Sequence, residues 1–179
     1  MVSYRLANKS DYPEINAFHN RIYGTNRTME QFLWEFHDGP HGQSIYVIAE
    51  DQGKVVGTNC VIPIILINGN RKEYRTGKSE DTLVDPDYRG QRIFYKIYDF
   101  LFEKCLEGEI EFVWGFTSAI KPFKKIGFDV PFNQKQSLIV NKPFKSYRFL
   151  VSLNPKNKLT DKIKILGLSV LSKMRGVLK

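Results

Sequence analysis

The sequence predicts an α+β fold in which helices flank a mixed, mostly antiparallel sheet. The elements read in the order β-α-α-β-β-β-α-β-α-β, so strands outnumber helices. Two strand-like runs, residues 44–50 and 54–67, are joined only by Asp51-Gln52-Gly53, which is typical of an antiparallel hairpin. A helical run at residues 93–106 separates two further strands, and a helix crossover of this kind joins parallel strands.

The N-terminal part reads as one strand, at residues 2–7, and two helices. Each helix has residues at its ends that favour helix initiation or termination. The expected boundaries are an N-cap at Ser10 or Asp11 with Pro13 in the first turn, a stop at Gly24, a second N-cap at Thr28 and a stop at residues 38–40.

The second half continues the alternation. After the hairpin we expect a strand within residues 72–84, the helix at 93–106, a strand at 110–116, a short helix at 119–128 that Gly127 ends, and a last strand at 137–144. The strand at 110–116 has no charge after Glu111, so we expect it in the centre of the sheet.

Charge divides the chain into a neutral domain, residues 1–140, and a basic extension, residues 141–179. The first part holds 17 Lys and Arg against 18 Asp and Glu, and the second holds 10 against one, Asp161. A chain of 179 residues is long enough for one domain with a real core. The basic pI therefore concerns the extension only.

Compartment signals favour the cytoplasm. The start of the chain has no apolar segment typical of a signal peptide, and the longest apolar run, residues 60–67, is far shorter than the ~20 residues that span a bilayer. Cys60 and Cys105 lie in apolar runs and read as free buried thiols.

The stretch VDPDYRGQRIFYKIYDFL, residues 84–101, joins a strand to a helix through a short Arg-Gly loop. The first N–H groups of a helix lack intrahelical partners and carry partial positive charge, so this loop suits a pyrophosphate. Arg89 and Arg92 add formal charge, and Gly90 permits close backbone approach. Spacing alone fits a tight turn with solvated arginines equally well, because the loop has a single glycine.

In its setting between strand and helix, this loop resembles the acetyl-CoA pyrophosphate loop of the GNAT family of N-acetyltransferases. Arg89 and Gly90 match that loop. Downstream, AIKPFKKIGF resembles a helix of the same family, and the element order is similar from about residue 2 to residue 140. Four positions depart from the family pattern: Arg92 and Phe94 in the loop, Phe116 in place of an Asn, and Phe123 in place of a Tyr that often protonates the departing thiolate.

The resemblance implies an acyl-CoA-binding fold with splayed central strands and an N-acetyltransferase that uses acetyl-CoA without a metal. The acceptor would be a small molecule with a primary amine, and an amino sugar is our example. The strand at Leu83 and Val84 would hold the pantetheine. Backbone amides would hold the pyrophosphate in the segment made of Arg89, Gly90, Gln91, Arg92, Ile93 and Phe94.

Such a reaction needs a neutral amine, and we favour Glu80 as its base, acting through water. Asp81 is adjacent, and neighbouring strand residues point to opposite faces, so at most one of the two is expected to face the substrate. The alternative is that both are solvated charges near a strand end. Phe123 cannot donate a proton, but a thiolate leaves readily without help.

Other residues suggest weaker alternatives. His37 and His41 have a spacing that suits a metal, yet Gly and Pro between them favour an ordinary loop. His19 is expected to be a packed or surface histidine. The aromatic residues of the first two helices are expected in the core more often than in an acceptor pocket; they are Tyr23, Phe32, Trp34 and Phe36.

The extension has apolar residues at helical spacing over residues 158–179, with lysines and arginines largely off that stripe. This basic amphipathic helix is expected to pack on protein, with peripheral contact to an anionic membrane or the start of a further domain as alternatives. Residues 142–149 interleave basic and aromatic side chains, but without a recognisable module we do not expect nucleic-acid binding.

A second hypothesis assigns the protein a binding function without catalysis. The four departures at Arg92, Phe94, Phe116 and Phe123 also fit a GNAT-fold module that binds acyl-CoA or a protein and no longer catalyses. Turnover of an amine panel separates the two hypotheses. The sequence does not indicate an oligomeric state.

Overall fold

The computed structural model describes residues 1–131, 142–152, 160, 162–167 and 170. It divides into two compact units, Met1–Asp129 and Val130–Lys179. The first unit contains the sheet and the residues of the candidate site. The predicted boundary between residues 140 and 141 falls outside the described residues and stays a prediction.

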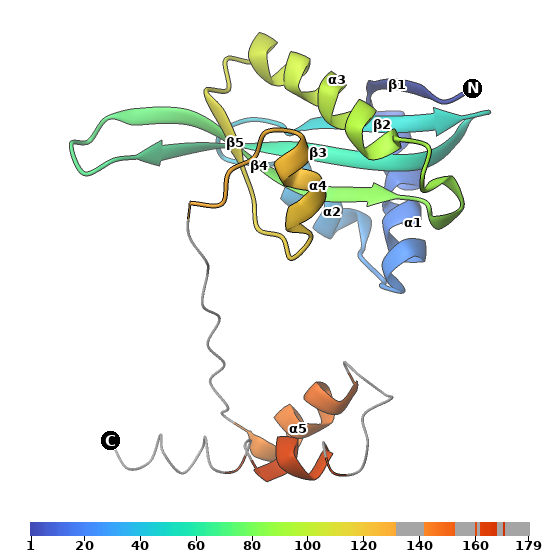
Figure 1. The fold of residues 1–179 in the computed structure, drawn as a ribbon, viewed down its shortest axis with the longest axis vertical. Coiled ribbons are helices and arrows are strands. Elements are labelled where there is room, and N and C mark those ends of the chain that lie inside the picture. The colour runs from blue at the N-terminus through green and yellow to red at the C-terminus, as the bar shows by residue number, and fades with distance from the viewer. Residues whose placement is uncertain (132–141, 153–159, 161, 168–169, 171–179) are drawn as a thin grey trace. The chain divides into compact units, whose positions relative to one another are not determined.

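The first unit is built on one five-stranded sheet in the order β1-β2-β3-β4-β5 (Figure 1). Neighbouring strands are antiparallel except for β4 and β5, which are parallel, as the intervening helix predicts. The prediction of a mixed, mostly antiparallel sheet is therefore confirmed. The strands are β1 Ser3–Leu6, β2 Ile45–Asp51, β3 Lys54–Ile67, β4 Glu73–Val84 and β5 Phe112–Trp114.

Helices cover both faces of the sheet and give it two separate cores (Figure 1). Helices α1, Tyr12–Tyr23, and α2, Met29–Phe36, pack on one face, and α3, Ile93–Glu107, packs on the other. Strands β2 and β3 serve both cores because their side chains alternate: Tyr46 and Ile48 face α1 and α2, whereas Val47 and Ala49 face α3.

The ends of the first two helices are where the sequence predicts them. Asp11 precedes α1, and Gly24 ends it in the left-handed conformation at φ 63°. Thr28 caps α2 through a capping box: its hydroxyl accepts from the Gln31 amide at 3.2 Å, and the Gln31 side chain accepts from the Thr28 amide at 2.8 Å.

Gly57 on β3 lets α3 approach the sheet. A Cβ at this position would lie 2.9 Å from Ile97 Cδ1 and 3.0 Å from Ile93 Cγ2, closer than a side chain tolerates. Both isoleucines are almost fully buried. This contact fixes the first turns of α3, and with them the loop that follows β4.

The C-terminal part departs from expectation at two places. β5 has three residues and lies at the edge of the sheet within the described part, so the central position expected for residues 110–116 is not observed there. The strand expected at 137–144 lies largely outside the described residues, and its last two residues, Pro143 and Phe144, begin helix α5, Pro143–Ser152. A short helix, α4, covers Ile120–Lys125 as predicted.

Most of the predicted basic helix at 158–179 lies outside the described residues. Residues 162–167 are helical, and the helix as a whole stays a prediction. In the part of the chain that the structure describes, no helix is long and apolar enough to cross a membrane.

Candidate active site at the end of strand β4

The loop after β4 presents a row of free backbone amides. Within the described residues, the N–H groups from Gly90 to Tyr95 donate to no acceptor, and the first bond of α3 is from Lys96 N to Arg92 O at 3.2 Å. Gly90 and Arg92 are both left-handed, at φ 82° and 62°. Amides at a helix N-terminus attract anions, and the exposed Arg89 and Arg92 add positive charge.

Two apolar side chains of this segment point into the core around α3. Ile93 is buried against Gly57. The Phe94 ring packs on Tyr98 and Phe123, with ring centroids 4.9 and 5.3 Å apart. Phe94 therefore packs against the core around α3.

The Phe123 ring lies among the same aromatic residues, 5.6 Å from Tyr98 and 5.5 Å from Phe128 between centroids. Phe116 is largely exposed and lies beside Trp114, at 5.8 Å. Of the four departures from the family pattern, Phe94 and Phe123 thus contribute to the core under α3.

Strands β4 and β5 separate just before the site. They pair at Thr76–Phe112, Gly77–Val113 and Lys78–Trp114, and no pairing follows in the described residues. The edge of β4 from residue 79 to residue 84 is therefore open toward β5. Leu83 and Val84, the predicted pantetheine contacts, lie on this part of β4, with Leu83 buried and Val84 half-buried. Their role stays a prediction.

Strand β4 carries a bulge at Asp81, which has φ 52°. The hydroxyls of Ser79 and Thr82, three residues apart, both donate to Asn59 Oδ1 at 3.2 Å on the α3 face. The two residues between them, Glu80 and Asp81, belong to the face of α1 and α2. The expected alternation of Glu80 and Asp81 between opposite faces is therefore not observed, because the bulge interrupts it. Which of the two faces the substrate stays a prediction.

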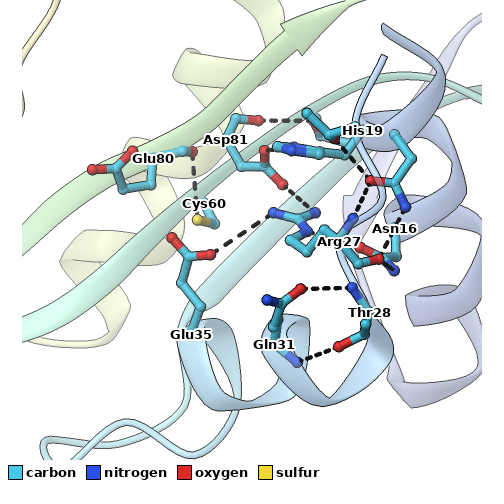
Figure 2. A network of polar contacts seen from close by, with 12 residues as sticks. Asn16, His19, Arg27, Thr28, Gln31, Glu35, Cys60, Glu80 and Asp81 are labelled. Atoms are coloured by element: carbon cyan, nitrogen blue, oxygen red, sulfur yellow. Dashed lines mark hydrogen bonds and ion pairs between the residues drawn. The ribbon is translucent and has the colours of Figure 1, made fainter. Parts of the chain in front are cut away.

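Asp81 is the centre of a buried polar network, and its side chain is only 3% exposed (Figure 2). His19 Nδ1 lies 2.5 Å from Oδ1, and Oδ2 accepts from Arg27 Nη2 at 3.1 Å and from the Tyr46 hydroxyl at 2.5 Å. Burial, followed by the charge of Asp81, raises the pKa of Tyr46 well above its ordinary value.

Helix α1 and the rings of α2 hold Arg27 in place. Asn16 Oδ1 accepts from Arg27 Nε at 2.8 Å, and Asn20 Oδ1 accepts from the Arg27 backbone amide at 2.8 Å. The guanidinium carbon lies 5.1 Å from the ring centroids of Phe32 and Phe36. Arg27 is thus a fixed counter-ion for Asp81.

Two more carboxylates surround this network. Glu80, turned away from His19 in Figure 2, is 35% exposed and pairs with Lys78 Nζ at 2.5 Å. Glu35 of α2 is 40% exposed and lies 3.9 Å from Arg27. Burial and the charges of Asp81 and Glu80 raise the pKa of Glu35, although Arg27 opposes them.

The sequence gives no sign of the roles of His19 and Arg27. Both reach Asp81 across more than fifty residues of chain, so no local pattern connects them. Among the aromatic residues, Phe32 and Phe36 are core as expected, whereas Trp34 and Tyr23 are exposed, and Tyr23 lies beside His19 with ring centroids 4.9 Å apart.

In the part of the chain that the structure describes, no three His, Cys, Asp or Glu side chains gather in a way that could hold a metal ion. His37 pairs with its neighbour Asp38 at 2.9 Å on the surface, and His41 is exposed.

Residues 3–130 match the family model described as an acetyltransferase (GNAT) domain. The chain belongs to the GNAT acetyltransferase family. The sheet with separating β4 and β5, and helices on both faces, is thus the GNAT fold. A search of the curated proteins finds no match.

Solved structures share this GNAT fold. Glucosamine-6-phosphate N-acetyltransferase from Arabidopsis thaliana matches with a TM-score of 0.61 and 21% identity, over 77% of this chain and 98% of that chain. A predicted acetyltransferase from Clostridium acetobutylicum, solved with acetyl-CoA, matches with a TM-score of 0.64 and 19% identity, over 79% and 99%. At such identities the similarity concerns the fold.

Proposed function

We propose that this GNAT protein is an N-acetyltransferase that moves an acetyl group from acetyl-CoA to the primary amine of a small molecule. The observation that carries the proposal is that three features follow one another along residues 79–95. They are the buried network around Asp81, the open edge of β4 and the free amides of residues 90–95. The Clostridium acetobutylicum neighbour, solved with acetyl-CoA, supports the choice of cofactor.

The donor side of the site uses backbone groups. Bound acetyl-CoA would supply the acetyl group as a thioester. The amides from Gly90 to Phe94 would hold its pyrophosphate, with the Arg89 side chain beside them because the Arg89 amide donates to Pro86 O at 3.3 Å. The open β4 edge at Leu83 and Val84 would hold the pantetheine. A backbone N–H on this edge would also polarise the thioester carbonyl, an effect that can be worth ~3 kcal/mol.

The acceptor side is the face of α1 and α2. Three carboxylates, Glu35, Glu80 and Asp81, stand here against two cations, Arg27 and Lys78. The excess of negative charge on this face would attract an ammonium group. Glu80 remains one candidate for the base, acting through water, although Lys78 occupies one of its oxygens.

An amino sugar is the acceptor that we favour. The Arabidopsis thaliana neighbour, a glucosamine-6-phosphate N-acetyltransferase, supports this class. The exposed ring of Tyr23, beside His19, offers an apolar face for a sugar. The departing thiolate would take its proton from solvent, because Phe123 has none to give.

A non-catalytic acyl-CoA-binding module is the second candidate. The observation behind it is the aromatic cluster of Phe94, Tyr98 and Phe123, which stands where the family has its usual proton donor. It predicts acetyl-CoA binding without turnover.

Thermal unfolding with acetyl-CoA tests the donor side. At a hundredfold excess over the dissociation constant, binding adds ~2.7 kcal/mol, or roughly 5–10 °C for a chain of this size. Gly90→Pro should abolish the shift, because proline cannot adopt φ 82°. Gly42→Pro, at another exposed left-handed glycine, is the matched control and should keep it. No shift at millimolar acetyl-CoA would contradict the proposed cradle.

Free-thiol release with a panel of amines that includes glucosamine 6-phosphate tests the reaction. Turnover that requires both the amine and an intact Gly90 loop would support the transferase. Binding of acetyl-CoA with no thiol released above the rate of hydrolysis, for any amine in the panel, would favour the binding module.

A further inference from the structure

His19 and Asp81 form a dyad whose geometry is fixed on three sides. Asp81 Oδ1 accepts from His19, and Oδ2 accepts from Arg27 (Figure 2). Oδ2 also accepts from the Tyr46 hydroxyl, so the carboxylate cannot rotate without breaking a hydrogen bond. The Thr58 hydroxyl donates to the Asp81 carbonyl at 2.8 Å and also holds the backbone of the bulge.

This arrangement selects one tautomer of the histidine. A carboxylate accepts hydrogen bonds only, so His19 Nδ1 must carry a proton, and in the neutral ring the lone pair lies on Nε2. The described residues provide no hydrogen-bond partner for Nε2. The side chain is 17% exposed, so the ring is held firmly and still reached by solvent.

We propose that His19 is the general base of the transfer reaction, with Asp81 as the residue that positions it. The inference rests on the proposed function. The acceptor ammonium gives one proton to Nε2, and its nitrogen then forms a bond to the acetyl carbon. The carbon–sulfur bond breaks with its electron pair on sulfur, the thiolate takes a proton from solvent, and the second amine proton leaves to water. The imidazolium is stabilised by Asp81 and returns its proton to solvent.

His19 suits this role better than Glu80 does. An imidazole ordinarily titrates near neutral pH, where a general base is most effective, whereas a carboxylate ordinarily titrates well below it. Glu80 is also engaged by Lys78 at 2.5 Å. Glu80 then acts as the charge that attracts the ammonium ion.

The pH dependence of this site depends on every charged or titratable group around the imidazole. A change in the charge of any of them changes how readily His19 accepts a proton. They come from β4, β2, the α1–α2 connection, α2 and α1, and they are Asp81, Glu80, Tyr46, Arg27, Glu35 and Tyr23.

His19→Asn is the variant that tests the proposal. The asparagine amide can replace Nδ1 as the donor to Asp81, but it cannot take a proton. We expect kcat/KM for the best amine of the panel to fall by about 10²–10⁴ near pH 7, with the loss shrinking as pH approaches the pKa of the amine itself. His37→Asn is the matched control, because His37 also places Nδ1 on an aspartate but at the surface. It should leave kcat/KM unchanged.

Three outcomes separate this inference from the proposed function. Activity of His19→Asn within threefold of the wild type, with the same pH profile, would overturn the role of His19 and leave the transferase intact. If the wild-type protein acetylates no amine of the panel, both the proposed transferase function and the role of His19 are overturned. An unchanged acetyl-CoA thermal shift in His19→Asn shows that the fold and the donor side are preserved.

Nitrogen NMR of the histidine rings tests the dyad without any substrate. The protein has three histidines, and the surface variants His37→Asn and His41→Asn each remove one signal and leave that of His19. We expect the neutral ring to carry its proton on Nδ1. A ring protonated on Nε2 in its neutral form would refute the dyad, even if the asparagine variant failed to fold.

Discussion

Arg21 of helix α1 binds Asp85, the first residue after β4, with 3.0 Å between Nη2 and Oδ2. Asp85 is only 1% exposed, and Lys54 Nζ lies 3.6 Å from the same oxygen. The other oxygen accepts from the Asp87 amide at 3.1 Å. The acceptor-side helix thus holds the start of the loop that we propose binds the donor.

Asp85→Asn should lower the free energy of unfolding at pH 7 by about 2 kcal/mol, because two cations lose a buried partner. It should also weaken acetyl-CoA binding, because the loop is anchored there. Urea unfolding and acetyl-CoA titration measure the two effects. Asp87→Asn, exposed in the same loop, is the control. Equal losses in both variants would show that the Arg21 contact has no special role.

Acid should destabilise the protein partly through Asp85. Burial alone would raise the pKa of this carboxyl, but the Asp87 amide, Arg21 and Lys54 outweigh burial and lower it. The unfolded chain therefore binds more protons than the folded one in acid. The stability that Asp85 contributes is complete above its ordinary pKa near 3.9, and it is lost as pH falls through the lower pKa of the folded state. Between pH 5 and pH 2 the melting temperature of Asp85→Asn should fall less steeply than that of the wild type. Parallel curves would contradict this.

Arg92→Gly should not destabilise the protein. A non-glycine residue at φ 62° carries about 1–2 kcal/mol of strain, which glycine would relieve. Glycine also gives the unfolded chain more conformational entropy, which opposes part of that gain. We therefore expect the free energy of unfolding to rise by between zero and about 1 kcal/mol. Glu109→Gly, at φ 56° just after α3, is a matched control for the backbone effect. Acetyl-CoA affinity should fall by less than about tenfold if backbone amides hold the phosphates. Complete loss would assign that role to the Arg92 side chain.

Glu35→Gln should raise stability at pH 7. The raised pKa of Glu35 means that the folded state holds its proton more tightly than the unfolded chain, so the charged form costs stability once pH exceeds the ordinary glutamate value. The gain should stay below about 1 kcal/mol, because the side chain is 40% exposed, and should vanish below pH 4. Glu30→Gln, exposed on the same helix, should give no gain. A loss of stability in Glu35→Gln at pH 7 would mean that its contact with Arg27 outweighs burial.

The elements that the sequence locates correctly are those with local signals. The Thr28–Gln31 capping box and the left-handed Gly24 involve residues a few positions apart, and the hairpin at residues 44–67 depends on one short turn. The loop after β4 is visibly short of glycine in the sequence. The structure adds that Arg92 keeps the left-handed conformation even without glycine.

The bulge and the dyad cannot be predicted in the same way. Aspartate adopts the left-handed region more readily than most residues, but that preference alone does not predict φ 52° at Asp81 within a strand. The conformation depends on Tyr46, Arg27 and His19, which come from three other parts of the chain. Alternation along β4 therefore predicts the wrong face for one carboxylate. The sequence indicates only a packed or surface histidine at His19 for the same reason, because its partner lies 62 residues away.

The sheet that separates the two cores also limits how far a substitution on one face affects the other face. Residues of α1 and α2 surround the proposed amine site, whereas α3 and the residues beneath it support the cradle for the acyl donor. Free-energy effects at sites that share no contacts add nearly independently. Apart from the Arg21–Asp85 contact, substitutions around the proposed amine site should therefore change the accepted amine with little effect on binding of the acyl carrier.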